Sequence, residues 1–261
     1  MLFVFDLDGV IYRELQVVKG AVETTKYLQR KGHTVTYATN NALLSRRQYL
    51  VKLKGMGFDV KLDEIMCAAG AAGDYLWKNG GKKNKVFVIG EKGLKSEVKS
   101  SGAILAGFED PNSSVDYVVA GLDRNFTYKK LYKAQQYVLG GAKLIATNKD
   151  ATYPAANNRT FPGCGSIIAA LEAACGREAF VLGKPLPYML DRLFELTGYR
   201  PEKTIVVGDR VETDILFGKS RKTTTVLVLT GITAKQDVLH IRKEMKPDIV
   251  LKSMVLLRKM Y

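Results

Sequence analysis

Histidine and cysteine are scarce in this chain, whose 261 residues include two histidines and three cysteines. Cys67, Cys164 and Cys175 are odd in number and form no Cys-x-x-Cys pair, which argues against a disulfide framework and against a thiolate zinc site. With so few nitrogen and sulfur donors, any bound metal is expected to have oxygen ligands. Oxygen ligands favour magnesium or calcium over zinc or copper.

Long hydrophobic runs are absent as well. No apolar run approaches the roughly 20 residues that a membrane-spanning helix needs, and Asp6 and Asp8 interrupt the short apolar start before it could serve as a signal peptide. With 46% hydrophobic and 25% charged residues, the chain can form a sizeable core. We therefore expect a globular protein of the cytoplasm, without a membrane segment.

Acidic residues are outnumbered by basic ones, 26 to 40, which gives a formal net charge of +14. Such a charge could indicate a nucleic-acid partner. The excess is spread along the whole chain, however, and its densest clusters, residues 82–85 and 221–222, are short. A solvated basic surface is therefore favoured over a nucleic-acid site, and it would attract anionic substrates such as phosphate esters.

Short apolar, β-branched runs alternate with segments of helical period, which predicts an α/β fold with a parallel sheet covered by helices. The expected strands of the two ends of the chain are residues 2–5, 34–38, 204–207 and 224–229, and the expected helices are residues 21–30, 45–56 and 187–197. After a polar break at residues 79–83 a second α/β segment begins. Since chemically suggestive residues lie on both sides of it, we expect an inserted domain over residues 80–180, between residues 1–79 and 181–261 of a first domain.

Asp6 and Asp8 follow the first expected strand. Side chains two apart in an extended chain point the same way and lie roughly 6.5 to 7 Å apart. Two such carboxylates can flank one phosphoryl group, the first attacking phosphorus and the second protonating the leaving oxygen and later activating water. The alternative is a strand end with ordinary Asp turn chemistry.

A second acidic pair, Asp209 and Asp214, follows the strand expected at residues 204–207. Both could approach the sheet edge at which Asp6 lies, where oxygen ligands from separate strand ends suit Mg²⁺. For Asp214 a helix cap is an equally good explanation.

Two further segments suit the same edge. Thr39 and Asn40 close the second strand and offer a hydroxyl, an amide and backbone N–H groups to phosphoryl oxygens. Lys184 follows a short apolar run, where its ammonium could neutralise charge on the equatorial oxygens. Taken singly, an ordinary turn and a solvated lysine are the favoured explanations of these residues.

In chain order, these residues resemble the four signature motifs of haloacid dehalogenase (HAD) superfamily phosphatases. The motifs read Asp6-x-Asp8-Gly9-Val10, Thr39-Asn40-Asn41, Gly183-Lys184-Pro185 and Gly208-Asp209-(x4)-Asp214. Within the inserted segment, residues 121–128, 145–150 and 162–166 are similar to the NagD-type, p-nitrophenylphosphatase-like branch with its class II cap. The resemblance implies a Rossmann-like parallel-sheet HAD core with an inserted α/β, C2-type cap domain.

The resemblance also implies roles for these residues. Asp6 matches the nucleophile that forms an aspartyl-phosphate and ligates magnesium, and Asp8 matches the general acid/base whose backbone carbonyl completes the metal site. Thr39 matches the phosphoryl-binding hydroxyl, with Asn40 beside it, and Lys184 matches the charge-neutralising lysine. Asp209 matches the principal acidic metal ligand of the last motif, and Asp214 its partner, which binds directly or through water.

Cap residues are candidates for substrate contact, because the cap of this family closes over the leaving group. Asn148, Asp150 and Arg159 could reach a polar leaving group, whereas Asp123 or Arg124 could anchor the turns of the cap. Cys164 lacks a histidine partner for nucleophilic work and is expected to pack.

The expected function is that of a magnesium-dependent phosphomonoester hydrolase, which acts on small phosphorylated metabolites and p-nitrophenyl phosphate through an aspartyl-phosphate. One alternative is a phosphotransferase or mutase on the same scaffold. Another is a non-catalytic protein that binds a phosphate ligand or nucleic acid. A homodimer formed through the cap also fits the resemblance.

Overall fold

The structure is a computed structural model and describes residues 1–108, 114–155 and 159–261. It divides into two compact units, each considered by itself: unit 1 comprises residues 1–39, 49–66 and 184–261, and unit 2 comprises residues 40–48 and 67–183. Residues 40–48 and 67–79 thus group with unit 2, although we expected them in the first domain. The domain boundaries at 79/80 and 180/181 stay a prediction.

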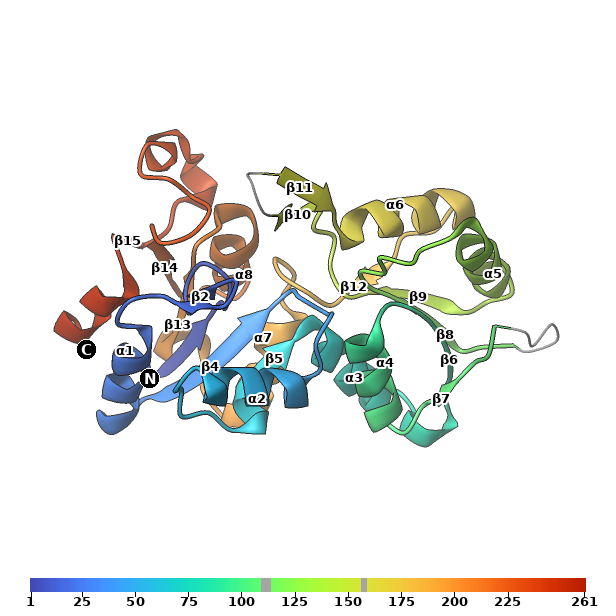
Figure 1. Cartoon of the computed structure of the whole chain (residues 1–261), viewed down its shortest axis with the longest axis horizontal. Helices are drawn as coiled ribbons and strands as arrows, with labels where there is room; N and C mark the ends of the chain where they lie inside the picture. The colour runs from blue at the N-terminus through green and yellow to red at the C-terminus, as the bar shows by residue number, and fades with distance from the viewer. Residues whose placement is uncertain (109–113, 156–158) are drawn as a thin grey trace. The chain divides into compact units, whose positions relative to one another are not determined.

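Unit 1 is built on a parallel sheet of six strands in the order β15-β14-β13-β1-β4-β5. The strands are β1 (Leu2–Phe5), β4 (Thr34–Thr39), β5 (Ile65–Cys67), β13 (Thr204–Gly208), β14 (Thr224–Val228) and β15 (Ile249–Leu251). All four residues of β1 are buried, because β1 pairs with β4 on one side and β13 on the other. Segments from both ends of the chain, blue and orange to red in Figure 1, therefore build this unit.

Helices of unit 1 follow the expected amphipathic segments. They are α1 (Ala21–Arg30), α2 (Arg46–Gly55), whose first turn groups with unit 2, α7 (Tyr188–Thr197) and the short α8 (Leu216–Lys219). Helix α1 buries one face, and α7 ends at Gly198, whose φ of 72° is the left-handed conformation that glycine adopts readily. A π-helical turn over Val211–Ile215 precedes α8, and a small hairpin joins β2 (Tyr12–Arg13) to β3 (Gln16–Val17).

Unit 2 has its own parallel sheet, in the order β12-β9-β8-β6-β7. Its strands are β6 (Lys85–Ile89), β7 (Ile104–Leu105), β8 (Tyr117–Ala120), β9 (Lys143–Ala146) and β12 (Phe180–Val181), with a separate antiparallel hairpin of β10 (Thr152–Ala155) and β11 (Arg159–Pro162). Its helices are α3 (Ala68–Lys78), α4 (Lys92–Ser100), α5 (Tyr128–Leu139) and α6 (Cys164–Cys175). Figure 1 shows α3 and α4 on one face of this sheet and α5 and α6 on the other.

The interior of unit 2 explains two features of the sequence. Cys164 is 3% exposed and belongs to the hydrophobic core between β8, β9 and the helices α5 and α6, so the expected packing role is what the structure shows. Helix α3 lies so close to α4 that a Cβ atom on Gly73 would be 2.6 Å from the carbonyl oxygen of Glu97. This close packing of α3 on α4 agrees with the grouping of residues 67–79 with unit 2.

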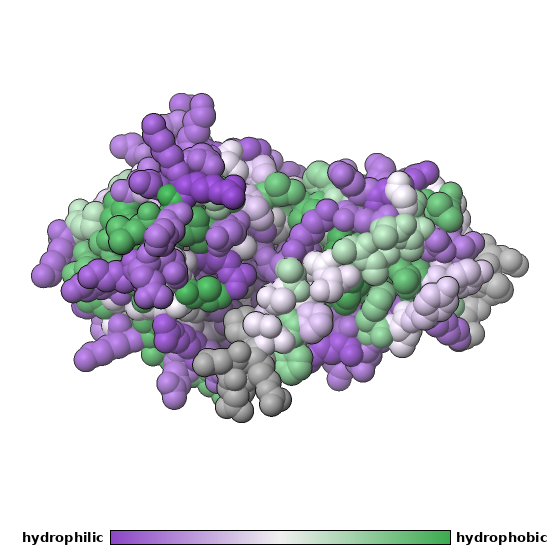
Figure 2. Space-filling view, turned by 90° about the horizontal axis from the view of Figure 1, so that it is seen from above, coloured by the Kyte–Doolittle hydropathy of each residue, from purple (hydrophilic) through white to green (hydrophobic). Residues whose placement is uncertain are grey.

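Short 3₁₀ turns complete the described chain, over Leu62–Glu64, Gly81–Lys83, Pro201–Lys203, Asp237–His240, Lys243–Met245 and Met254–Lys259. Across the ranges that the structure describes, no helix combines the length and the apolar character needed to cross a bilayer. Hydrophilic residues are spread over the face seen in Figure 2, with smaller groups of hydrophobic residues among them.

Candidate active site

Three carboxylates meet at the carboxyl edge of the sheet of unit 1. Asp6 follows β1, and its backbone N–H donates to the carbonyl of Val207 in the neighbouring strand β13, at 2.9 Å. Asp209 follows β13 directly, and Asp214 lies in the π-helical turn after it. One carboxylate oxygen from each of Asp6, Asp209 and Asp214 lies within 4.8 Å of the other two. Parallel strands that end at one edge thus bring together the three side chains predicted as metal ligands.

The ammonium group of Lys184 joins two of these carboxylates. Its Nζ donates to Oδ1 of Asp6 at 2.5 Å, to Oδ1 of Asp214 at 2.6 Å and to the carbonyl of Ala38 at 3.0 Å. The side chain is only 4% exposed. Although burial opposes its charge, the negative charges of Asp214 and Asp6 raise the pKa of Lys184. These charges therefore favour the cationic form of Lys184.

Backbone amides donate to Asp214 as well, and to Asp209. Oδ2 of Asp214 accepts from the N–H groups of Asp209 and Arg210 at 3.2 and 3.1 Å. Oδ2 of Asp209 accepts from the N–H of Ile232 at 2.7 Å. These hydrogen bonds fix the orientation of both side chains.

Negative charge is in excess within this cluster, since three carboxylates face one ammonium. Burial and then the charge of Asp214 raise the pKa of Asp209 to about 6. Burial also raises the pKa of Asp6 well above its usual value, because Lys184 only partly offsets burial and the two neighbouring carboxylates. A divalent cation would relieve this repulsion, and carboxylate oxygens are the donors that Mg²⁺ prefers.

Asp8 lies outside the three-carboxylate cluster and has its own partners. Its side chain is exposed, and partial loss of hydration raises its pKa. The hydroxyl of Tyr12 donates to the Asp8 carboxylate. Nζ of Lys52 lies 3.6 Å from the centre of the Tyr12 ring, and its charge partly opposes the rise in the pKa of Asp8. Tyr12 and Lys52 thus form part of the environment of Asp8.

Comparison with known proteins identifies the family. The family described as haloacid dehalogenase-like hydrolase matches residues 3–104, and the family described as HAD-hydrolase-like matches residues 181–257. Phosphoglycolate phosphatase 2 of Arabidopsis thaliana is 37% identical over an alignment of 265 positions, gaps included. The alignment covers 94% of this chain and 88% of the relative. The chain belongs to the haloacid dehalogenase-like hydrolases.

Two solved structures of this family agree with the described fold. The p-nitrophenyl phosphatase from Archaeoglobus fulgidus has a TM-score of 0.93 at 32% identity, covering 100% of this chain and 98% of its own. A glycerol phosphate phosphatase from Mycobacterium tuberculosis, solved in complex with magnesium, has a TM-score of 0.87 at 28% identity, covering 99% of this chain and 77% of its own. The expected HAD fold and its NagD-type, p-nitrophenylphosphatase-like branch are confirmed.

Three other residues predicted to bind substrate contact one another in unit 2 of this HAD chain. Nδ2 of Asn40 donates to the two carboxylate oxygens of Asp150 at 3.2 and 3.1 Å. Nδ2 of Asn148 donates to the backbone carbonyl of Asn40 at 2.8 Å, and the Asp150 N–H donates to Oδ1 of Asn148 at 3.0 Å.

Thr39, the last residue of β4 in unit 1, is buried with 3% exposure. Arg159 is the first residue of β11, and its side chain lies outside the described part of the chain.

Asp123 and Arg124 hold turns of unit 2, which is the role expected for them from the sequence. Asp123 accepts from the N–H of Asn125 at 3.0 Å and from Nζ of Lys130 at 2.7 Å. Nε and Nη2 of Arg124 each donate to the carboxylate of Glu91 at 2.7 Å.

Sequence reasoning missed Tyr12, Lys52 and the backbone of Ile232. Tyr12 lies four residues after Asp8 in a turn, in which the Gly9 N–H donates to the Tyr12 carbonyl at 2.7 Å. The periodicity of a strand or a helix therefore does not predict that Tyr12 lies near Asp8. Lys52 follows buried Tyr49 by three positions on α2, and a lysine on a buried helix face was a usable signal. Ile232 carries no such signal, because its backbone N–H donates to Asp209 and every residue except proline has this group.

Proposed function

We propose that this chain is a magnesium-dependent phosphomonoester hydrolase that works through an aspartyl-phosphate on Asp6. The supporting observation is the group of half-buried Asp6 with buried Asp209 and Asp214, in which Nζ of Lys184 donates to Oδ1 of Asp6. Attack on a phosphate ester requires an oriented carboxylate, here Asp6, and a nearby positive charge, here the ammonium of Lys184. Relatives that are phosphatases support the same reaction.

Mg²⁺ fits the residues present. Carboxylates of Asp6, Asp209 and Asp214 would hold it, with the backbone carbonyl of Asp8 as a further donor proposed from the family pattern. The three side chains offer hard oxygen donors, and their excess negative charge needs a cation. When bound, the ion supplies positive charge that lowers the repulsion between Asp6 and a phosphate dianion.

The chemical steps follow from the positions of Asp6 and Asp8. A carboxylate oxygen of Asp6 attacks phosphorus, the bond from phosphorus to the ester oxygen breaks, and Asp8 gives its proton to the departing oxygen. Asp8 then takes a proton from water, whose oxygen attacks phosphorus, so that inorganic phosphate leaves and the carboxylate of Asp6 is regenerated. A raised pKa favours the protonated form of Asp8, from which the first step starts. Throughout, Lys184 offsets negative charge next to Asp6.

Thr39 is proposed to donate its hydroxyl to a phosphoryl oxygen, since it ends the strand next to β1. Asn40 is proposed as a second donor, and Asn148, Asp150 and Arg159 as contacts for the leaving group. Names of relatives point to phosphoglycolate, glycerol phosphate and p-nitrophenyl phosphate as substrates of those proteins. We therefore propose small phosphorylated metabolites as the substrate class.

Phosphate release from p-nitrophenyl phosphate and a panel of metabolite monophosphates tests the proposal, with Mg²⁺ and with EDTA. We expect release with Mg²⁺, loss of release with EDTA, and no release by Asp6→Asn. Asp63→Asn, which changes an exposed aspartate of unit 1, is the matched control and should keep full activity. Acid quenching during turnover should give wild-type protein heavier by one phosphoryl group, and Asp6→Asn protein without it.

Three outcomes would contradict the proposal. Substantial release by Asp6→Asn would exclude the aspartyl-phosphate, and full release in EDTA would exclude the metal. Phosphorylated acceptor in place of free phosphate would identify a phosphotransferase instead.

Three further features stay predictions. The first is a homodimer, in which a second copy of this chain contacts the cap. Tyr128 and Tyr132, one turn apart on α5, are 82% and 54% exposed there. Light scattering after size-exclusion chromatography measures whether the dimer forms. A cytoplasmic location stays a prediction of the sequence. The predicted lack of a nucleic-acid partner is tested by retention on heparin as a function of salt.

A further inference from the structure

The sheet of unit 2 has a point at which its chain connections diverge. In chain order its strands are β6, β7, β8, β9 and β12, and in space they lie as β7-β6-β8-β9-β12. The connection after β6 leads outward to β7, whereas the connection after β8 leads the other way, to β9. In doubly wound sheets of this order, ligands bind in the crevice at the carboxyl ends of the two strands from which the connections diverge.

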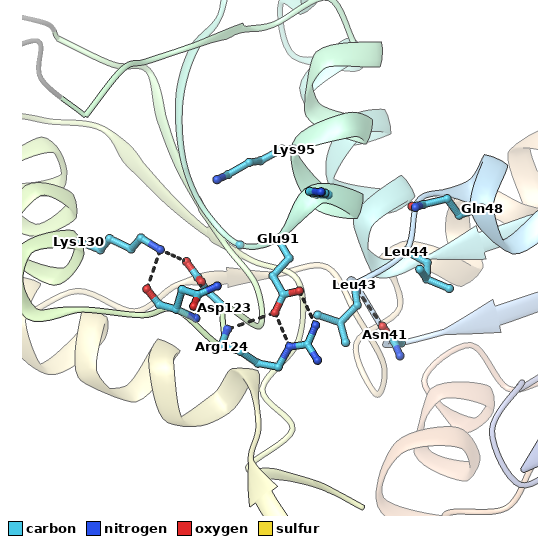
Figure 3. Close-up of a pocket in the computed structure, with 12 residues that line it drawn as sticks. Asn41, Leu43, Leu44, Gln48, Glu91, Lys95, Asp123, Arg124 and Lys130 are labelled. Carbon is cyan, nitrogen blue, oxygen red and sulfur yellow. Dashed lines mark hydrogen bonds and ion pairs between the residues drawn. The ribbon is translucent and has the colours of Figure 1, made fainter. Parts of the chain in front are cut away.

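A cavity of about 650 Å³ lies at this point. Its walls come from the segment after β6, with Glu91, Lys92 and Lys95, and from the segment after β8, with Asp123, Arg124 and Lys130. Figure 3 shows Lys95 of α4 extending toward the side on which Lys130 of α5 reaches Asp123. None of Asp6, Lys184, Asp209 and Asp214 lines this cavity.

Positive charge is in excess within the cavity. Both acidic side chains are already paired, Glu91 with Arg124 at 2.7 Å and Asp123 with Lys130 at 2.7 Å. Lys92 and Lys95 have no acidic partner within the described ranges of the chain. Two ammonium groups are thus left to attract an anion into a recess between two loops.

Another part of the cavity wall is apolar and held in place. Leu43 and Leu44, which are half-buried, line the cavity. A Cβ atom on Gly93 would lie 2.3 Å from the carbonyl oxygen of Leu43, so this loop packs directly on the first turn of α4. At the end of the loop, the buried carboxylate of Glu97 accepts from the N–H of Arg46 at 2.6 Å and from its guanidinium at 2.9 and 3.1 Å. Contacts at Gly93 and Glu97 therefore preform the wall.

We propose that this cavity of unit 2 binds a small organic phosphate at a second site, built separately from the Asp6 cluster. Lys92 and Lys95 take the phosphate group, and Leu43 and Leu44 contact the organic part. The loop that carries these leucines follows Thr39 and Asn40 directly in the chain. A ligand in the cavity therefore contacts the segment that continues from the proposed phosphoryl-binding residues.

Binding of glycerol 3-phosphate, measured with amide NMR and calorimetry in EDTA, tests this proposal without turnover. We expect saturable shifts at the amides of Lys92, Gly93 and Arg124. Lys92→Gln combined with Lys95→Gln should weaken this binding at least tenfold. Lys82→Gln combined with Lys83→Gln, which removes two exposed lysines elsewhere in unit 2, is the matched control and should bind as wild type does. Unchanged melting temperatures of both double variants would show that they fold.

A second variant tests the apolar wall. Leu43→Ser should weaken binding of glycerol 3-phosphate more than binding of inorganic phosphate, since only the former has an organic part. Shifts confined to residues near Asp6, Thr39 and Asp209 would overturn the proposal, as would equal affinity in the Lys92→Gln, Lys95→Gln protein. Both results are independent of whether the chain hydrolyses phosphate esters.

Discussion

The backbone of Gly231 lies so close to the carboxylate of Asp209 that a Cβ atom at residue 231 would be 1.8 Å from Oδ2. The neighbouring N–H of Ile232 donates to the same oxygen at 2.7 Å. From the other side Gly9, with a φ of +81°, approaches so closely that its Cβ would be 2.4 Å from Oδ2. The Asp209 carboxylate can take this orientation because neither Gly9 nor Gly231 has a Cβ atom.

Gly231→Ala should displace Asp209 and weaken magnesium binding, because an added Cβ cannot remain 1.8 Å from an oxygen. We expect the magnesium concentration for half-maximal activity to rise at least tenfold. Titration of activity with Mg²⁺ measures this change. Gly55→Ala is the matched control, since a Cβ there meets nothing within 4 Å and no positive φ opposes it. Equal magnesium dependence in the two variants would show that Asp209 does not need its present position.

Lys184→Gln should destabilise the metal-free protein by about 3 to 5 kcal/mol, because it leaves two buried carboxylates without their ammonium partner. Urea unfolding in EDTA measures the loss. Added Mg²⁺ should recover part of it by supplying positive charge to the same carboxylates. Lys203→Gln, at an exposed lysine of unit 1, is the control. A variant as stable as wild type in EDTA would contradict the buried pairing.

The strand ends of the active site could be predicted because they depend on local sequence. Asp6 and Asp209 each follow a short apolar run, and adjacent parallel strands bring such positions to one edge. The observed strands differ from the expected ones by at most one residue at β1, β4, β13 and β14. Roles carried over from the HAD motifs are not tested by this agreement and stay part of the proposal.

Partners from distant parts of the chain could not be predicted. Asn40 and Asp150 are 110 residues apart, and nothing in the local sequence of either indicates their hydrogen bonds. The same applies to Asp209 and the Ile232 amide, since a backbone donor leaves no trace in residue type. We expect residues 67–79 in the first domain because the polar break follows them, whereas the structure groups them with unit 2, in which Gly73 packs closely on Glu97.

Tyr12→Phe should lower kcat about tenfold and leave KM nearly unchanged, because it removes a hydrogen bond to Asp8 but no proposed contact with substrate. Since the donated hydrogen bond stabilises the Asp8 carboxylate, its loss should raise the pKa of Asp8 further. The limb of the kcat profile that reports Asp8 should then move to higher pH. Steady-state kinetics across pH measure both effects. Tyr128→Phe, at an exposed tyrosine of α5, is the control. A changed KM with unchanged kcat would assign Tyr12 to substrate binding instead.

Asp248 links strands β14 and β15, and its pairing should make stability depend on pH in the acid range. Its Oδ2 accepts from the backbone N–H and from the hydroxyl of Thr225 at 2.7 and 2.6 Å. Burial opposes ionisation, but these hydrogen bonds outweigh it and hold the pKa of Asp248 below its usual 3.8. The folded state therefore gains stability from the carboxylate above about pH 4 and loses this gain as pH falls through the lowered pKa.

Asp248→Asn should accordingly be less stable than wild type at neutral pH, and the difference should shrink as the pH falls below about 4. Urea unfolding at several pH values between 7 and 3 measures it. Asp63→Asn, the exposed change in unit 1, accounts for the general effect of removing one carboxylate. A difference that grows toward acid would reverse the sign required by a lowered pKa. Such a result would mean that Thr225 donates to the protonated rather than the ionised carboxyl group.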